Sequence, residues 1–307
     1  SDYRLAYEEA MEMIDGRLEA KIAPQKSADF SGTPQGERQE ALLEALRTLN
    51  GLAKQLRAKR FEHGAINFET PEVRFLLDEQ GNPTEIIFHR SNDANHLIEE
   101  FMLLANRTVA ESVGKVPKNQ KAKVIPYRIH DIPDPTKLMK LGEFVSKFGY
   151  RIKTQGTKGD ISRNLNKMLA EAHGKAEQNV IEMVTLRAMM KAKYSVHNIG
   201  HYGLAFPYYT HFTSPIRRYP DLMVHRLITK YATGGRSVNP VKYEELCEQC
   251  SEAEQTAALA ERASIKYKQV EFMKDHLGET FQGTISGVTE FGLYVEVNEN
   301  KCEGFVP

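Results

Sequence analysis

Residues 200–227 read "GHYGLAFPYYTHFTSPIRRYPDLMVHRL", a stretch that combines six aromatic rings, three histidines and three arginines with a single carboxylate, Asp221. Two adjacent arginines do not both face one core, so Arg217 or Arg218 must reach an anion, either an internal carboxylate or a bound phosphate. Rings interleaved with guanidinium groups are typical of surfaces that bind single-stranded nucleic acid. The residue types alone leave open the alternative that both arginines neutralise glutamates of a neighbouring helix.

The whole chain supplies no electrostatic field that would attract a polyanion. Its 307 residues include 41 Lys and Arg and 41 Asp and Glu, so the formal net charge is zero and any polyanion must be held by a local patch. No apolar run is long enough to span a bilayer, and Ser1 does not open a signal peptide. Cys247 and Cys250 are spaced as CxxC, but no second ligand pair follows, which favours reduced thiols over a zinc site.

Around the opening stretch, hydrophobic periodicity predicts an α+β fold in which long helices accompany a mixed sheet. Two strands are expected within residues 73–90, around a Gly81-Asn82-Pro83 turn. Apolar stripes predict the helices. These helices are expected within residues 3–16, 38–61, 92–113, 130–150, 177–195, 219–235 and 241–278.

The composition changes at about Gly278. The following residues, "ETFQGTISGVTEFGLYVEVNENKCEGFVP", are rich in glycine and β-branched side chains and suit short strands. We therefore expect two domains, residues 1–277 and residues 278–307, with the boundary at this change.

Several motifs carry a resemblance to a known family. "HFTSPIRRYPDLMVHR", with "GHYGLA" and "LIEEFMLLAN" upstream of it, resembles the ribonuclease II/ribonuclease R family and in particular its bacterial ribonuclease R branch. Further similar segments run through nearly the whole chain, such as "YRIHDIPDP" and "AERASIKYKQVEFM". The closing segment resembles the start of an S1 domain, an RNA-binding OB-fold, of which about three of about five strands fit here.

The resemblance implies a function. Members of the family are processive 3′-to-5′ exoribonucleases with an RNB catalytic domain, and they hydrolyse single-stranded RNA to nucleoside 5′-monophosphates with Mg²⁺. The resemblance implies the same RNA partner, bound by its 3′ end, and a cytoplasmic location. The family's metal-binding Asp-x-Asp-Asp cluster is not in this sequence. We therefore expect a fragment covering the later part of an RNB domain and the start of an S1 domain, inactive by itself and with no metal ligands of its own.

The resemblance also implies roles for the two arginines. Arg217 is expected to contact the scissile phosphate and to stabilise the transition state, as a planar donor fork can. Arg218 is expected either to bind RNA or to pair internally. Tyr219 and the two flanking prolines are expected to set the turn, and the histidines to act as scaffold, since no spacing among them demands a metal.

Other RNA contacts are expected on the same ground. Glu100 matches a carboxylate that accepts a hydrogen bond from the 2′-hydroxyl, with Glu99 as the alternative on the same helix. Phe68 matches an aromatic that closes the base stack, and Glu261 a carboxylate that lines the channel. Phe291 and Tyr294 match the stacking rings of an OB-fold. For Phe68 a core position, and for Glu261 a solvated helix face, remains the alternative.

Two other functions stay open from the sequence. The first is a non-catalytic RNA-binding module that uses the same basic and aromatic groove. The second is a structural helical protein whose arginine pair is internal, for which no salt-dependent RNA affinity is expected.

Overall fold

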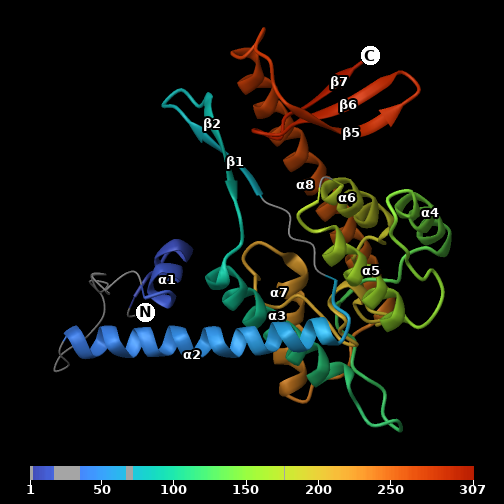
Figure 1. The fold of residues 1–307 in the computed structure, drawn as a ribbon. Coiled ribbons are helices and arrows are strands. Elements are labelled where there is room, and N and C mark those ends of the chain that lie inside the picture. Colours follow the sequence, from blue (N-terminus) through green and yellow to red (C-terminus); the bar gives the residue numbers. More distant parts are fainter. Residues whose placement is uncertain (1–2, 17–34, 67–71, 176) are drawn as a thin grey trace.

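The computed structural model describes residues 3–16, 35–66, 72–175 and 177–307 and confirms the α+β class (Figure 1). The helices are α1 (Tyr7–Ile14), α2 (Gln35–Glu62), α3 (Asp93–Gly114), α4 (Pro135–Ser146), α5 (Lys158–Ala172), α6 (Gln178–Ala188), α7 (Tyr219–Ala232) and α8 (Pro240–Lys274). The strands are β1 (Glu72–Leu77), β2 (Pro83–His89), β3 (Tyr127–Ile129), β4 (Lys193–Ser195), β5 (Gly283–Thr289), β6 (Gly292–Val297) and β7 (Glu303–Val306).

Side-chain caps explain where three of the helices begin. At the start of α3, Asn92 accepts hydrogen bonds from the backbone N–H groups of Ala94 and Asn95. At the start of α8, Asn239 accepts from those of Val241 and Lys242. Asp134 caps α4, whose first residue is a proline. A cap of this kind satisfies N–H groups that have no partner within the helix. Two of these helices, α3 and α8, carry predicted site residues.

The strands form small sheets. The hairpin β1–β2 is antiparallel and turns at Gly81, which has a positive φ, as the sequence predicts. The Lys268 ammonium group donates to the Gly81 carbonyl over 2.6 Å, so the hairpin tip touches α8. The pair β3–β4 is antiparallel, and an isolated parallel bridge between His130 and His201 extends it into a mixed arrangement.

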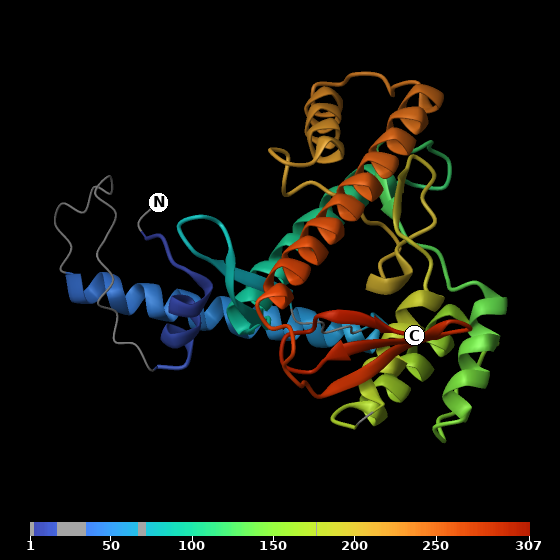
Figure 2. The same ribbon diagram turned by 90° about the horizontal axis from the view of Figure 1, so that it is seen from above.

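The main apolar core lies among α4, α5 and α6, which stand together on one side of the molecule (Figures 1 and 2). Leu138 and Leu141 from α4 meet Leu165 and Met168 from α5, all at most 1% exposed. Helix α5 has no counterpart among the helices expected from the sequence. The helix expected within residues 177–195 is shorter than predicted, because α6 ends at Ala188 and residues 193–195 pair with β3.

The C-terminal residues form the antiparallel sheet β5–β6–β7, which is not closed into a barrel within the described residues. It follows α8, a helix of 35 residues that is about 50 Å long at 1.5 Å per residue. Gly278 lies between α8 and β5 with a φ of 93°. The Gln269 side chain donates to the Lys301 carbonyl over 3.0 Å and holds the sheet to the end of α8. No helix in the described part of the chain combines the length and apolarity needed to cross a membrane.

Candidate nucleic-acid interface

The segment 210–218, which leads into α7, is held from α3 by one buried side chain. The Asn106 side-chain oxygen accepts from the backbone N–H of Phe212 over 2.9 Å and from that of Thr213 over 3.2 Å. The side-chain nitrogen of Asn106 donates to the Tyr209 hydroxyl over 3.2 Å. Because Asn106 is 3% exposed, these bonds are shielded from competing water. The first half of the segment is therefore fixed to α3.

The second half of the segment is held from α7. Asp221, which is fully buried, accepts through Oδ1 from the Ser214 N–H over 2.8 Å and from the Arg218 guanidinium over 2.9 Å. The Ser214 carbonyl in turn accepts from the N–H groups of Arg217 and Arg218 over 3.3 and 3.0 Å. The lone carboxylate of the opening stretch thus closes the turn from which both arginines project.

The two adjacent arginines differ in their surroundings. Arg218 pairs with Asp221, which is one of the two alternatives that the sequence left open for it. Arg217 is exposed, next to the fully exposed Ile216. No side chain among residues 3–16, 35–66, 72–175 and 177–307 makes a hydrogen bond or ion pair with the Arg217 guanidinium. Arg217 therefore has its donor fork available for an anion from outside the chain.

Beneath this turn the rings and histidines pack on one another. The Tyr194 hydroxyl lies 2.8 Å from His211 Nδ1, and the His211 ring meets the Tyr209 ring edge-on at 5.6 Å. Burial lowers the pKa of His211 to about 2, with further lowering by Arg218 and other nearby cations. Burial likewise lowers the pKa of His201 to about 3. Both imidazoles are therefore neutral at pH 7, as expected for scaffold.

Arg128 supports the same ring cluster from β3. Its guanidinium lies 4.6 Å from the centre of the Tyr194 ring and pairs with Glu254 of α8 over 2.5 Å. His225 stacks on Phe212 with 4.0 Å between ring centres and lies 2.9 Å from the Phe212 carbonyl through Nε2. These contacts hold the cluster of aromatic and histidine rings (the aromatic floor) in place beneath residues 214–218, the arginine turn.

Glu100 and Glu99 lie in different environments on α3. Glu100 is 3% exposed, and both of its carboxylate oxygens lie within hydrogen-bond distance of the Arg60 guanidinium. The Glu99 side chain is 45% exposed and makes looser contacts, with Arg60 at 3.5 Å and with Arg57 at 3.7 Å. Arg60 lies in the last turn of α2, so the buried pair ties α2 to α3. Glu99 is the member of the pair whose carboxylate a ligand can reach.

The remaining predicted contacts lie apart from this turn. Glu261 is exposed on α8. Phe291, at the turn before β6, is 81% exposed, and Tyr294 is 36% exposed with its ring 5.2 Å from that of Phe305. Phe68 lies outside the described residues. Of the predicted residues, Arg218 and Glu99, the alternative on α3, line one small pocket, whereas Phe291 and Tyr294 belong to the β5–β6 hairpin.

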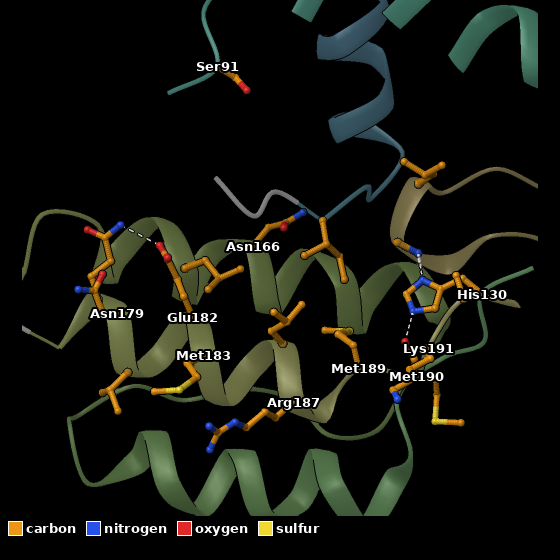
Figure 3. A pocket seen from close by; sticks show the side chains of 18 of the residues that line it. Ser91, His130, Asn166, Asn179, Glu182, Met183, Arg187, Met189, Met190 and Lys191 are labelled. Atoms are coloured by element: carbon orange, nitrogen blue, oxygen red, sulfur yellow. Dashed lines mark hydrogen bonds between the residues drawn. The ribbon is translucent and has the colours of Figure 1, made fainter. Parts of the chain in front are cut away.

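A large cleft of about 3240 Å³ runs between α5 and α6 on one side and the C-terminal sheet on the other. Figure 3 shows part of its wall, with Met183 and Arg187 on α6 and His130 held by hydrogen bonds to the Gly203 N–H, over 2.9 Å, and the Met190 carbonyl, over 2.7 Å. Its lining includes nine Arg and Lys side chains against seven Asp and Glu, so the cleft is only slightly basic.

Of the carboxylates on α3, Glu99 lines this cleft. It also lines a smaller pocket of about 260 Å³ together with Asn106 and Arg218. The contacts of Asn106 and Arg60 have no direct signal in the sequence, because both residues bind partners far away in the chain. A usable sign was the spacing of seven between Glu99 and Asn106, which places both on one face of a helix.

Comparison with known proteins identifies the family. The family model described as "RNB domain" matches residues 1–234. The chain belongs to the RNB family. A second model, "S1 RNA binding domain", matches residues 274–307. Both matches agree with the resemblance that the sequence motifs indicate.

Named relatives of this RNB chain include ribonuclease R of Aquifex aeolicus, which is 38% identical over all of the chain and 41% of its own length. Ribonuclease R 1 of Lactococcus lactis is 40% identical over 82% of the chain and 30% of its own length. The solved structure of Mycoplasma genitalium RNase R, in complex with ribose-methylated single-stranded RNA, has a TM-score of 0.81 and 25% identity, covering 97% of the chain and 44% of that protein. The RNB chain thus spans well under half of these relatives.

A metal centre does not fit the described residues of this RNB chain. They contain no group of three or more His, Cys, Asp and Glu side chains placed to hold a metal ion. Cys247 is buried, and burial raises the pKa of its thiol to about 12, so it is not a thiolate ligand at pH 7. No chemical step can therefore be assigned to a metal held by these residues.

Proposed function

We propose that this chain is the RNA-holding part of a 3′-to-5′ exoribonuclease that hydrolyses single-stranded RNA to nucleoside 5′-monophosphates. The observation that carries the proposal is Arg217, an exposed guanidinium with no hydrogen-bond or ion-pair partner in the described part of the chain, on a turn fixed by Asn106 and Asp221. Membership of the RNB family and the likeness to an RNA-bound ribonuclease R support it. Magnesium dependence and a cytoplasmic location belong to the same proposal and rest on the family alone.

In this proposal Arg217 binds a phosphate of the RNA near its 3′ end. A guanidinium presents two parallel N–H donors to a phosphate and stabilises the charge that develops there during hydrolysis. Arg218 fixes the turn through Asp221 and reaches the RNA only through its remaining donors. The aromatic floor keeps the turn in one conformation, so that little ordering is needed when RNA binds.

Recognition of the ribose is assigned to Glu99 in this proposal. A carboxylate that accepts a hydrogen bond from a 2′-hydroxyl lets a protein discriminate RNA from DNA. Glu100, predicted for this role, already uses both oxygens on Arg60 and is buried, whereas Glu99 is exposed and lines the large cleft. Roles for Phe68, Glu261, Phe291 and Tyr294 in binding RNA remain proposals, as does a division into residues 1–277 and 278–307.

RNA binding by the 307-residue chain tests the role of Arg217. We expect Arg217→Ala to weaken binding of a fluorescein-labelled oligouridylate about tenfold, the effect of losing one hydrogen-bonded charge. Fluorescence anisotropy measures the affinity. Arg236→Ala, at an exposed arginine after α7, is the matched control and should leave the affinity within about twofold. Equal affinities for the wild type and Arg217→Ala would contradict the proposal.

A second candidate is a non-catalytic RNA-binding module. It is favoured by the lack of an Asp-x-Asp-Asp motif in all 307 residues. For the chain by itself both candidates predict RNA binding without turnover, so release of mononucleotides in the presence of Mg²⁺ would contradict both. The longer protein that contains this chain separates them, because only the exoribonuclease reading predicts that it releases mononucleotides.

A further inference from the structure

One buried amide on α3 makes all its hydrogen bonds to a single distant segment. Asn106 accepts two backbone N–H groups, those of Phe212 and Thr213, and donates to the hydroxyl of Tyr209. More than 100 residues of chain separate it from these partners. An apolar residue of the same size would leave two part-buried N–H groups without this acceptor.

The hydrogen bonds continue from Asn106 to Arg217. Residues 212 and 213 are followed directly by Ser214, which Asp221 holds through its N–H and whose carbonyl accepts from Arg217 N. The Arg217 side chain has no hydrogen bond or ion pair of its own within the described residues. The point from which the Arg217 side chain projects is therefore set by the backbone of the turn, and Asn106 fixes the near end of that backbone.

We propose that Asn106 is a positioning residue that sets where Arg217 meets the RNA phosphate. The proposal rests on the proposed function, since it assumes that Arg217 binds a phosphate. Glu99 lies two turns earlier on the same face of α3 and lines the same small pocket as Asn106 and Arg218. Helix α3 thus fixes the separation between a carboxylate that a ligand can reach and the arginine turn.

Binding of RNA to four forms of the chain tests this role. They are the wild type, Asn106→Leu, Arg217→Ala and the double variant, each measured by anisotropy with a labelled oligouridylate over a range of salt concentrations. We expect both single variants to lose about tenfold in affinity and the double variant to lose no more than Arg217→Ala alone, because coupled residues are not additive. The slope of log K against log salt should fall by about 0.7 in both single variants.

The change in slope is the result that a merely structural asparagine would not produce. Asn106→Leu removes no charge, so its slope changes only if the arginine no longer reaches its phosphate. Affinity losses that add in the double variant, or a slope equal to that of the wild type in Asn106→Leu, would overturn the proposal.

Amide hydrogen exchange tests the positioning without RNA. In Asn106→Leu we expect the N–H groups of Phe212 and Thr213 to lose protection, while Asn106→Asp, which keeps an accepting oxygen, retains it. Leu97→Ala, at a buried apolar position of α3, is the control for general destabilisation and should leave these two amides protected.

The two proposals fail in different ways. If Arg217→Ala binds RNA as the wild type does, the proposed function is wrong. In that case the exchange of the Phe212 and Thr213 amides still decides whether Asn106 fixes the turn. Unchanged protection of these amides in Asn106→Leu means that Asn106 does not position the turn.

Discussion

Adjacent residues of one type perform different tasks in this chain because their burial differs. Arg218 is bound to the buried carboxylate of Asp221, whereas Arg217 is exposed without such a partner. Glu100 is closed in an ion pair with Arg60, whereas the Glu99 carboxylate is open to the cleft. In each pair the less exposed member makes a close internal ion pair, and its neighbour is the one that a ligand can reach more easily.

This difference predicts separate effects for the two glutamates. Glu100→Gln should lower the free energy of unfolding by about 3–5 kcal/mol, because it leaves the Arg60 charge buried without its main partner. Glu99→Gln should change stability by less than about 1 kcal/mol, as for an exposed pair. Urea denaturation measures both.

Glu99→Gln should instead reduce the preference of the chain for RNA over DNA of the same sequence, measured by anisotropy. If a folded Glu100→Gln variant loses more of this preference than Glu99→Gln does, the residue that contacts the ribose is Glu100.

The neutral His211 predicts a pH dependence of stability. Its pKa is about 2 in the folded chain against an ordinary value of 6.5, so below pH 6.5 the unfolded chain binds a proton that the folded chain does not. Stability should therefore fall as the pH drops, by about 2 kcal/mol from this residue between pH 6.5 and pH 5. In His211→Gln, urea denaturation at several pH values should show a shallower fall. An identical slope would show that His211 is not held neutral.

At the scale of helices and strands, local patterns account for much of the fold. The apolar stripes and caps predict α2, α3, α4, α7 and α8, and the Gly81 turn predicts the β1–β2 hairpin. Residues 193–195 were wrongly assigned to a helix, because their pairing with β3 joins segments more than 60 residues apart and leaves no local periodicity. The missed α5 begins after a Thr157 capping box that also lies in the sequence.

In the candidate site, too, local sequence shows some residues, and long-range contacts determine the others. The two arginines and Asp221 stand together in "TSPIRRYPD" and can be recognised in the sequence. The sequence also shows that the partner of each arginine must be a phosphate or a carboxylate. Asn106 and Arg60 are not visible in this way, because burial and long-range contacts give them their roles. The sequence therefore predicts which groups meet a ligand better than it predicts which groups hold them in place.

The cap of α3 supports the residues that this helix carries. Asn92→Ala removes the acceptor for the N–H groups of Ala94 and Asn95 and should lower the free energy of unfolding by about 1 kcal/mol. Asn92→Asp keeps the acceptor and should lie close to the wild type. Urea denaturation compares the three forms, and equal stability of Asn92→Ala and the wild type would contradict the importance of the cap.

At the scale of the whole molecule, the C-terminal sheet is joined to the rest mainly through the end of α8. Large apolar side chains are exposed on it, such as Phe291 at 81% and Val288 at 74%. Exposed apolar surface of this kind binds hydrophobic dyes. A chain shortened to residues 1–278 should therefore bind less of the dye ANS and keep a cooperative thermal unfolding transition.

The double variant Val288→Ser/Phe291→Ser is the matched control and should reduce dye binding without shortening the chain. If the shortened chain loses its cooperative transition, the sheet is part of the helical unit and the proposed division at Gly278 is wrong.

Because α8 is long, a small tilt at its start displaces its far end by several ångströms. The first turns of α8 follow the C-terminal end of α7, where Tyr243 packs with Leu227 and Tyr231, and its last turns carry the C-terminal sheet (Figure 2). A tilt of roughly 5° at its start would move its far end by about 4 Å over a length of about 50 Å. A displacement of that size exceeds the length of a hydrogen bond. A small rearrangement at the C-terminal end of α7, where α8 begins, would thus be enlarged into a change in the width of the cleft beside the sheet.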